Sequence, residues 1–368
     1  MTSNSESAPP LDVPSSDTTV KVSIIDSSGR LAHVPTKLFF EPHIDGFDFW
    51  EAPAYSFLVE HGHSGEKLLF DLGLRKDPEN YPPAVQKAVE GWRLSAEKDV
   101  RDILIDNGVS LADIKDIIWS HRHFDHIGDP SVFPPSTNLV VGPGLRKMVG
   151  EGYPIDDESV CSSSAWKNRN FHELDFHSDK RVTQIGRWEA LDWFNDGSFY
   201  LLHSVGHTVD HISGFARTKL GAQSRTGKDE FILMGGDVAH HGGEFKPNRF
   251  SPIPTKVSPD PRLAPYSGGF CPGEYYAQYN KRHDGDDRWR SPFLKSAKAF
   301  IDDPEKAVWS LEGVEEFDAH DNVFVVFSHD ATLLDVVEFY PRDATDWENK
   351  GWKREGRWRF LEDLKESS

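Results

Sequence analysis

Short apolar runs along the chain are typical of buried or half-buried strands. Strands are expected at VKVSIID (20–26), AYSFLVEHG (54–62) and KLLFDLG (67–73). Residues 83–93 and 96–107 carry charge at helical spacing, and they predict two helices before the next apolar strand, IKDIIWS (114–120). This order of strands and helices is that of an α/β fold, in which functional side chains follow the carboxyl ends of strands.

Metal-binding side chains follow four of the apolar strands. The four segments are HRHFDH (121–126) after IKDIIWS, SFYLLHSVGHTVDH (198–211), EFILMGGDVAHH (230–241) and DNVFVVFSHDATLLDVVEF (321–339). The last of these predicts a strand, the tripeptide Ser-His-Asp and then a helix. His121 and His123 are two residues apart, which puts both rings on one side of an extended segment. So many ionisable groups at one place are costly to bury without a cation.

The donor types narrow the choice of metal. Neutral imidazoles with carboxylates suit zinc, and also iron, manganese or cobalt. Asp125 and His126 turn toward a neighbouring position, so that two metals about 3.5–4 Å apart could be held. The chain has only Cys161 and Cys271, which excludes a structural zinc site built from cysteines.

These motifs resemble those of the metallo-β-lactamase superfamily over residues 20–340. HRHFDH resembles its His-x-His-x-Asp-His signature, and GHTVDH, GGDVAHH and FSHD resemble its later turns in the same order. The resemblance implies a four-layer αββα sandwich with the metals at one edge of the packed sheets. It also implies two zinc ions per chain, held by His121, His123 and His207, by Asp125, His126 and His329, and by a bridging Asp237.

The implied activity is that of a zinc-dependent hydrolase. A hydroxide that bridges the metals attacks a carbonyl carbon, and Asp125 passes a proton to the leaving group. A small cyclic ester or amide, a lactone or lactam, is the expected substrate, and the resemblance to fungal members extends this to an aromatic ring such as benzoxazolinone. Several lactonases of this family carry a tyrosine three residues after the bridging aspartate, where it polarises the substrate carbonyl. His240 stands there in this chain, so either it takes that catalytic role or another group does.

Residues from about 240 to 292 are rich in proline, glycine and aromatic residues, and we expect them to form a cap over the strand ends. Such a long loop is usually functional, and its aromatic residues suit an apolar or aromatic substrate. The cap aromatics expected at the substrate are Phe250, Tyr266 and Phe270. A glyoxalase-II-like thioesterase, which needs cations for glutathione carboxylates, stays open through Lys246, Arg249, Lys256 and Arg262.

Two further alternatives belong to other functional classes. A mononuclear-iron persulfide dioxygenase on the same scaffold would use His121, His123 and His207 with an aspartate. A non-catalytic metal-binding protein is disfavoured because all seven ligand positions are filled. The class B β-lactamases use a cysteine ligand near the position of Asp237, and this chain has none there, which disfavours antibiotic hydrolysis as the main role.

Composition limits the partners and the compartment. The formal net charge of the 368 residues is −19, which disfavours nucleic acid, and no apolar run approaches the length of a membrane span. Residues 1–19 lack the features of a secretory signal and predict a disordered tail. Two cysteines suit reduced thiols in the cytoplasm. The Trp-rich residues 341–368 are expected to pack on the domain, and together with the cap they are candidates for a homodimer interface.

Overall fold

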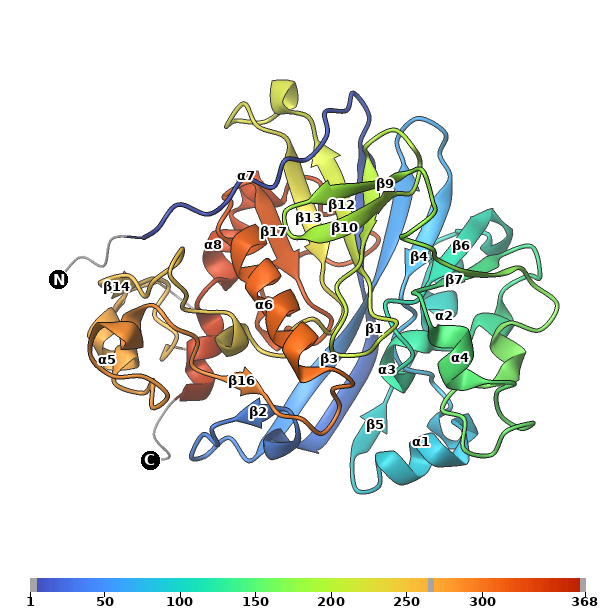
Figure 1. Ribbon diagram of the computed structural model, residues 1–368, viewed down its shortest axis with the longest axis horizontal. Helices are drawn as coiled ribbons and strands as arrows, with labels where there is room; N and C mark the ends of the chain where they lie inside the picture. The colour runs from blue at the N-terminus through green and yellow to red at the C-terminus, as the bar shows by residue number, and fades with distance from the viewer. Residues whose placement is uncertain (1–4, 264–267, 365–368) are drawn as a thin grey trace.

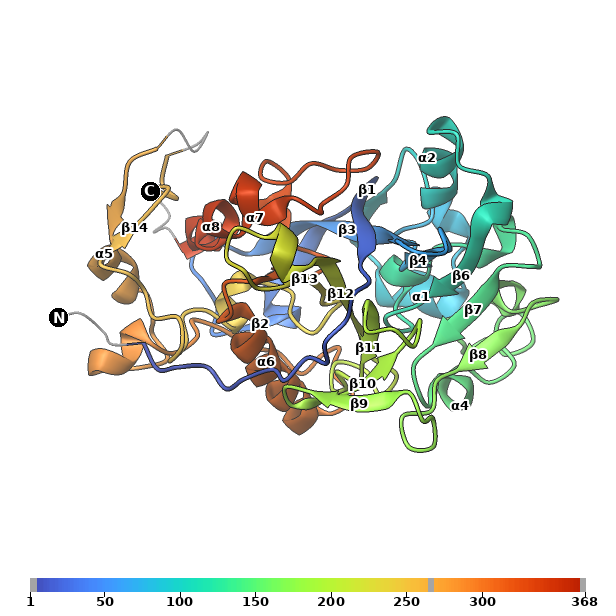
Figure 2. The same ribbon diagram turned by 90° about the horizontal axis from the view of Figure 1, so that it is seen from above.

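The computed structural model describes residues 5–263 and 268–364, and within them the chain forms two large β-sheets (Figures 1 and 2). The first sheet is mixed. In spatial order its strands are β5 (Arg93–Ser95), β1 (Val20–Pro35), β3 (Phe49–His61), β4 (Lys67–Phe70), β6 (Ile114–Ile118), β7 (Asn138–Val141) and β8 (Phe171–Glu173). The second sheet runs in the order β17 (Val323–Val326), β13 (Glu230–Met234), β12 (Ser213–Lys219), β11 (Phe199–Leu202), β10 (Trp188–Asp192) and β9 (Val182–Ile185).

The two sheets pack face to face through alternate residues of their strands. Val22 and Phe57 of the first sheet share a buried cluster with Leu201 and Met234 of the second. Because successive side chains of a strand point to opposite faces, the intervening residues of both sheets face outward and bind helices. This is the four-layer αββα sandwich that the sequence predicts.

Helices cover both outer faces. On the first sheet, α2 (Val100–Asp106) and α4 (Leu145–Val149) bury apolar side chains against β6 and β7. On the second sheet, α6 (Pro304–Asp318) packs through Val314 and Phe317. The Asp303 carboxylate accepts the Lys306 N–H and Pro304 opens the first turn, which fixes where α6 begins. The shorter helices are α1 (Pro83–Ala88), α3 (Phe124–Ile127), α5 (Gly273–Ala277), α7 (Trp347–Lys350) and α8 (Trp352–Gly356).

The prediction of a helix directly after FSHD is wrong. A 3₁₀ turn, Ala331–Leu333, stands at its place. The side chain of Asp330 caps this turn by accepting the Thr332 N–H. The chain then runs beside β1, where the N–H groups of Tyr340 and Ala344 each donate to a β1 carbonyl at 2.7 Å. These two bonds hold the chain beside β1 directly after the stretch predicted to be helical.

The prediction of a disordered tail is wrong for residues 5–19. Leu11 is only 7% exposed, packed among the side chains under α6, and its carbonyl accepts the Gly186 N–H at 2.8 Å. Further along, the Pro14 carbonyl accepts from Arg217, and the Ser16 hydroxyl donates to the Asp196 carbonyl. Residues 1–4 lie outside the described part. Residues 5–19 cross the second sheet as an extended segment (Figure 2).

Residues 240–292 also differ from the predicted unstructured loop. They contain the 3₁₀ helices Gly242–Glu244 and Gly285–Trp289, α5, and the small ladder of β14 (Lys256–Val257) with β15 (Cys271–Pro272). A second small ladder pairs β2 (Phe40–Glu41) with β16 (Lys295–Ser296). In both ribbon views β14 and α5 lie at one end of the long axis, opposite α2 and α4 (Figures 1 and 2).

The C-terminal segment packs on the body. Trp347 and Trp352 are buried in the cluster between the sheets, and the Lys353 ammonium donates to the Asp318, His320 and Val323 carbonyls at the end of α6. Residues 365–368 lie outside the described part. Among the described residues, no helix combines the length and the apolar character that crossing a membrane requires.

Candidate metal centre

The HRHFDH segment forms a loop and one helical turn directly after β6. His123 immediately precedes α3, and α3 presents Asp125 and His126 to the centre. Gly128 ends this turn at φ 48°, and a Cβ there would lie 2.5 Å from the Leu72 Cβ. Only glycine fits this backbone conformation so close to Leu72, so the turn that carries the ligands has one permitted shape.

Three other segments bring their side chains to the same edge of the sandwich. His207 follows β11, Asp237 follows β13 and His329 follows β17, each within a few residues of the strand's carboxyl end. β13 and β17 are neighbouring parallel strands, so Asp237 and His329 leave the sheet side by side. The structure thus brings together all seven side chains that the sequence motifs single out as metal ligands.

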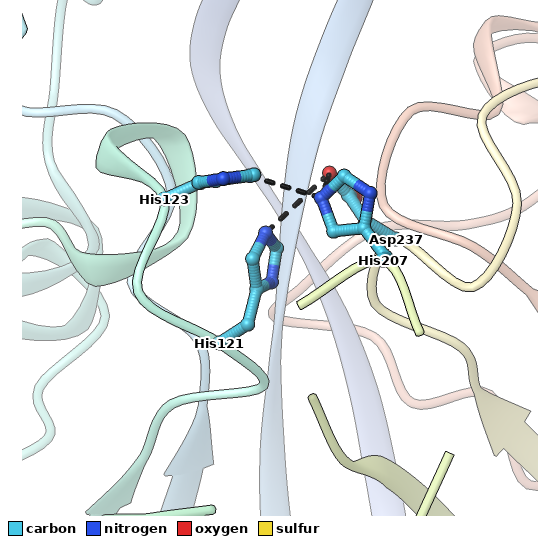
Figure 3. A group of neighbouring side chains, drawn as sticks. All are labelled: His121, His123, His207 and Asp237. Atoms are coloured by element: carbon cyan, nitrogen blue, oxygen red, sulfur yellow. Dashed lines mark hydrogen bonds and ion pairs between the residues drawn. The ribbon is translucent and has the colours of Figure 1, made fainter. Parts of the chain in front are cut away.

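The seven side chains form two groups. One group contains His121, His123, His207 and Asp237, whose ligand atoms all lie within 4.8 Å of one another and converge in Figure 3. The other group contains Asp125, His126 and His329, whose ligand atoms satisfy the same limit.

Asp237 lies between the two groups and turns one oxygen toward each. Its Oδ2 is 3.7 Å from His121 Nε2 and 3.6 Å from His207 Nε2. Its Oδ1 is 3.0 Å from His126 Nε2 and 3.2 Å from His329 Nε2. A carboxylate placed in this way can serve two neighbouring cations at once.

The buried polar atoms of this region fit bound cations. Within the described chain, His121 Nε2, His126 Nε2 and Asp237 Oδ1 are buried without a hydrogen-bond partner. Buried polar atoms are nearly always paired, so such a cluster requires an explanation. His207 Nε2 and His123 Nδ1 lie only 2.9 Å apart. Cations at the two positions would supply the missing partners.

The protonation states of the histidines in the first group also suit metal binding. Burial lowers the pKa of His121 and His207 well below the usual value, and it lowers the pKa of His123 to about 3. These imidazoles are therefore neutral near pH 7, which is the form that binds a metal. Burial would raise the pKa of Asp237, but the imidazoles of His126 and His329 hold it well below its ordinary value.

A shell of hydrogen bonds orients the ligand rings. Asp71, directly after β4, lies 2.8 Å from His126 Nδ1 and accepts the Ser120 N–H at 2.6 Å. His329 Nδ1 donates to the Pro53 carbonyl at 2.7 Å. His211 does not join either ligand group; its Nε2 accepts the Asp237 N–H at 3.0 Å. Sequence reasoning missed Asp71, although a carboxylate at the end of the apolar run KLLFDLG was a signal for it.

We expect Asp71→Asn to weaken binding at the metal position of His126 by about 10–100-fold, because the amide cannot accept as the carboxylate does from both His126 and Ser120. Titration of the apoprotein with zinc against a chromophoric chelator measures this. Asp116→Asn is the matched control, since Asp116 is a buried carboxylate of β6 that bonds Asn138 instead. Equal zinc affinities in both variants would contradict the role of Asp71.

Comparison with known proteins agrees with this geometry. The family model described as "Metallo-beta-lactamase superfamily" matches residues 50–217. Gamma-lactamase FDB1 of Fusarium pseudograminearum (strain CS3096) is 41% identical over 362 residues, which cover 97% of this chain and 85% of that protein. The chain belongs to the metallo-β-lactamase superfamily. Metallo-hydrolase mfmC of Annulohypoxylon moriforme is 36% identical over 363 residues, covering 97% of this chain and 90% of that one.

A solved structure supports the same fold. The crystal structure of a quorum-quenching N-acyl homoserine lactone lactonase superposes with a TM-score of 0.54. It is 16% identical and covers 89% of this chain and 100% of its own. At this identity the likeness concerns the metallo-β-lactamase fold, and it confirms the predicted architecture.

His240 lies inside this metallo-β-lactamase centre, whereas its neighbour does not. Its Nε2 is buried, has no hydrogen-bond partner among the described residues and lies 3.3 Å from Asp237 Oδ2. Its ring is stacked over that of His329, with 6.0 Å between centroids. Glu244 fixes the backbone by accepting the N–H groups of both His240 and His241. His241 turns away, and its Nε2 lies 3.1 Å from Asp363.

Four half-buried aromatic side chains form a connected group beside the centre, and we call them the aromatic rim: Phe39, Trp92, Phe124 and Phe300. Phe39 contacts the ring of His240 with centroids 5.1 Å apart, and Phe300 contacts that of His123 at 6.4 Å. Within the rim, Phe39 stacks on Phe300 at 5.2 Å and Trp92 lies 6.0 Å from each of them. None of the four comes from residues 240–292.

Two of the three cap aromatics predicted to contact substrate pack against cations of their own segment instead. Phe270 is 51% exposed and packs against Lys256, and Phe250 packs against Arg249. Tyr266 lies outside the described residues. The prediction failed because aromatic content alone does not say which face of a folded segment a ring occupies.

The cations expected of a glyoxalase-II-like site also have other roles. Lys246 is buried and donates to the Arg357 carbonyl at 3.3 Å. Arg262 pairs with Asp260 at 2.6 Å in its own segment. With Arg249 and Lys256 stacked on rings, the four do not form a cluster beside the metal ligands for an anionic substrate.

Proposed function

We propose that this protein is a metal-dependent hydrolase that opens a small cyclic ester or amide, a lactone or a lactam. The observation that carries the proposal is Asp237, which turns one oxygen toward each of two buried groups of unpartnered ligand atoms. The gamma-lactamase and metallo-hydrolase among its relatives support the same reaction class.

Two zinc ions are the metals that we propose for this centre. His121, His123 and His207 would hold one, Asp125, His126 and His329 the other, and Asp237 would contact both. Imidazole nitrogen and carboxylate oxygen without thiolate are a donor set that zinc accepts, as do iron, manganese and cobalt. When bound, such ions lower the pKa of water and polarise a carbonyl oxygen.

Asp125 is the proposed proton carrier. Its carboxylate is buried, and burial raises its pKa above the ordinary value. Asp125 Oδ2 lies 3.4 Å from His329 Nε2, a member of the same ligand group. From there the carboxyl can hold a proton and pass it to the leaving oxygen or nitrogen as the ring opens.

His240 is the proposed donor to the substrate carbonyl. In the tautomer that carries its proton on Nε2, the ring presents one N–H to the centre, and no described side chain accepts it. A donor held at a fixed position stabilises the negative charge that develops on the carbonyl oxygen. The packing of this ring against His329 and Phe39 holds it in place.

The aromatic rim favours a flat or apolar substrate. Faces and edges of aromatic rings bind other rings in stacked or edge-on arrangements, so an aromatic cyclic carbamate such as benzoxazolinone is the specific candidate. A mononuclear dioxygenase would leave the group of Asp125, His126 and His329 without a role. A non-catalytic metal-binding protein would have no use for the unpartnered His240 Nε2.

We place the protein in the cytoplasm on the basis of its thiols. Cys161 and Cys271 are both buried and free within the described chain, as expected for a reducing compartment. A homodimer through residues 240–292 or the C-terminal segment stays a prediction, which sedimentation of the purified protein would test.

Elemental analysis of the purified protein, paired with a hydrolysis screen, tests the proposed function. The panel contains γ-lactones, acyl-homoserine lactones, benzoxazolinone, a thioester and a β-lactam. We expect two zinc ions per chain, opening of a lactone or lactam, loss of activity with a chelator and its return with zinc. One iron per chain and no hydrolysis of any member would contradict the proposal.

A further inference from the structure

The ligand histidines are buried apart from one, and a ring of the rim contacts that one. His121, His126, His207 and His329 are buried, whereas His123 is half-buried. Phe300 contacts the ring of His123 edge-on, with 6.4 Å between centroids, and it also contacts Phe39 and Trp92 within the rim. A substrate that approached the centre beside His123 would therefore meet the ring of Phe300.

Phe300 belongs to a segment without regular structure that joins β16 to α6, residues 297–303, which we call the strap. In Figure 1 this orange segment runs out toward β3 and returns to the start of α6. At one end, the Ala297 N–H donates to the Phe39 carbonyl at 2.7 Å. At the other end, the N–H groups of Asp302 and Asp303 donate to the His207 and Gly206 carbonyls, each at 3.0 Å. Both ends are thus tied to residues of the centre or its rim.

A charged contact also holds the strap to the metal-binding loop. Arg122, which lies between His121 and His123, donates to both carboxylate oxygens of Asp302, at 2.9 and 2.8 Å. The same guanidinium bonds the buried Asp210, and Asp302 also accepts the Val209 N–H at 2.9 Å. Both bonds to Asp302 come from Nη2 of Arg122, and such charge-assisted hydrogen bonds are stronger than neutral ones.

We propose that Phe300 determines which substituents the substrate can carry, and that Asp302 is the residue that positions it. This inference rests on the proposed lactone or lactam hydrolysis. It identifies the part of the site that discriminates between substituted substrates. Phe300 suits this role because it is half-buried on the strap, whereas Trp50, a large ring beside His329, belongs to the core. A smaller side chain at 300 opens space at the rim without a cavity between the sheets.

A series of γ-lactones tests the proposal, from γ-butyrolactone to members with alkyl and phenyl substituents on the ring. We expect Phe300→Ala to raise kcat/KM for the large members relative to γ-butyrolactone by about tenfold or more, in line with the discrimination of apolar pockets. Metal content and the unfolding temperature should match those of the wild type. Phe270→Ala is the matched control, because that exposed ring lies beside Lys256, and its ratios should not change.

The variant Asp302→Asn tests whether Asp302 positions Phe300 or only stabilises the fold. The amide keeps the shape but loses the charged pair with Arg122, so we expect the same change of preference, carried mainly by KM rather than kcat. A merely structural role would lower activity on all lactones equally. If Phe300→Ala changes kcat/KM for every lactone of the series by the same factor, the inference is wrong, but the proposed hydrolase function is unaffected. If the wild type opens no lactone or lactam, the proposed function is wrong and the inference falls with it.

Discussion

We expect His126→Ala to bind about one metal ion per chain and to lose more than about 100-fold in hydrolysis while keeping its fold. His126 Nε2 lies 3.0 Å from the oxygen of Asp237 that faces the second ligand group, and Asp71 orients the ring from behind. Loss of a partner that only orients a ligand costs about 10–100-fold, so loss of the ligand itself costs more. Elemental analysis and kcat/KM on the best substrate measure the two effects.

His172→Ala is the matched control for this variant. His172 is an exposed histidine of β8 outside both ligand groups, so its removal should leave the metal content and turnover unchanged. Circular dichroism of both variants checks the fold. A His126→Ala protein that holds two ions and turns over like the wild type would show that the two-metal mechanism is wrong.

The ligand side chains could be predicted because their geometry is local. HRHFDH places its donors on one loop and one helical turn, and the other ligands directly follow the apolar strands β11, β13 and β17. Because these side chains follow the carboxyl ends of strands, they meet at one edge of the sandwich, and the lengths of the connecting loops do not change this. The family and the four-layer fold followed from the same four motifs.

The rest of the site depends on contacts between distant segments. Phe39, Trp92 and Phe300 meet only after folding, and none belongs to a motif that points to the metal centre. Asp71 contacts His126 because β4 and β6, the strands that precede these two residues, are neighbours in the first sheet. Residues 240–292 are the opposite case, in which composition predicted a contact with substrate that folding does not form. Phe270, for example, is an exposed ring next to β15.

Composition misled at the N-terminus for a related reason. Few apolar residues occur among residues 1–19, which is typical of disorder. A single well-placed side chain, Leu11, and backbone bonds to Gly186 and Arg217 nevertheless hold the described part of this segment on the second sheet. Such bonds depend on partners about 170 to 200 residues away, which no local pattern reports.

His240→Phe should lower kcat by about 10²–10³-fold with two metal ions still bound, which is the usual cost of removing one donor to a developing oxyanion. Phenylalanine keeps a ring that can stack on His329 and contact Phe39, so the substitution removes the Nε2 donor and little else. If His240 were instead needed to hold a metal, the metal content would fall with the activity. Stopped-flow or steady-state kcat, measured beside elemental analysis, separates the two roles.

His241→Phe controls for a new aromatic ring in the same turn. His241 is buried to a similar extent, but it turns toward Asp363 and the Gly243 N–H, away from Asp237. Loss of these contacts lowers stability without reaching the substrate, so kcat should stay at the wild-type value. Equal kcat for the wild type and His240→Phe would assign activation of the carbonyl to another group. His240 would then not replace the tyrosine that several lactonases carry at this position.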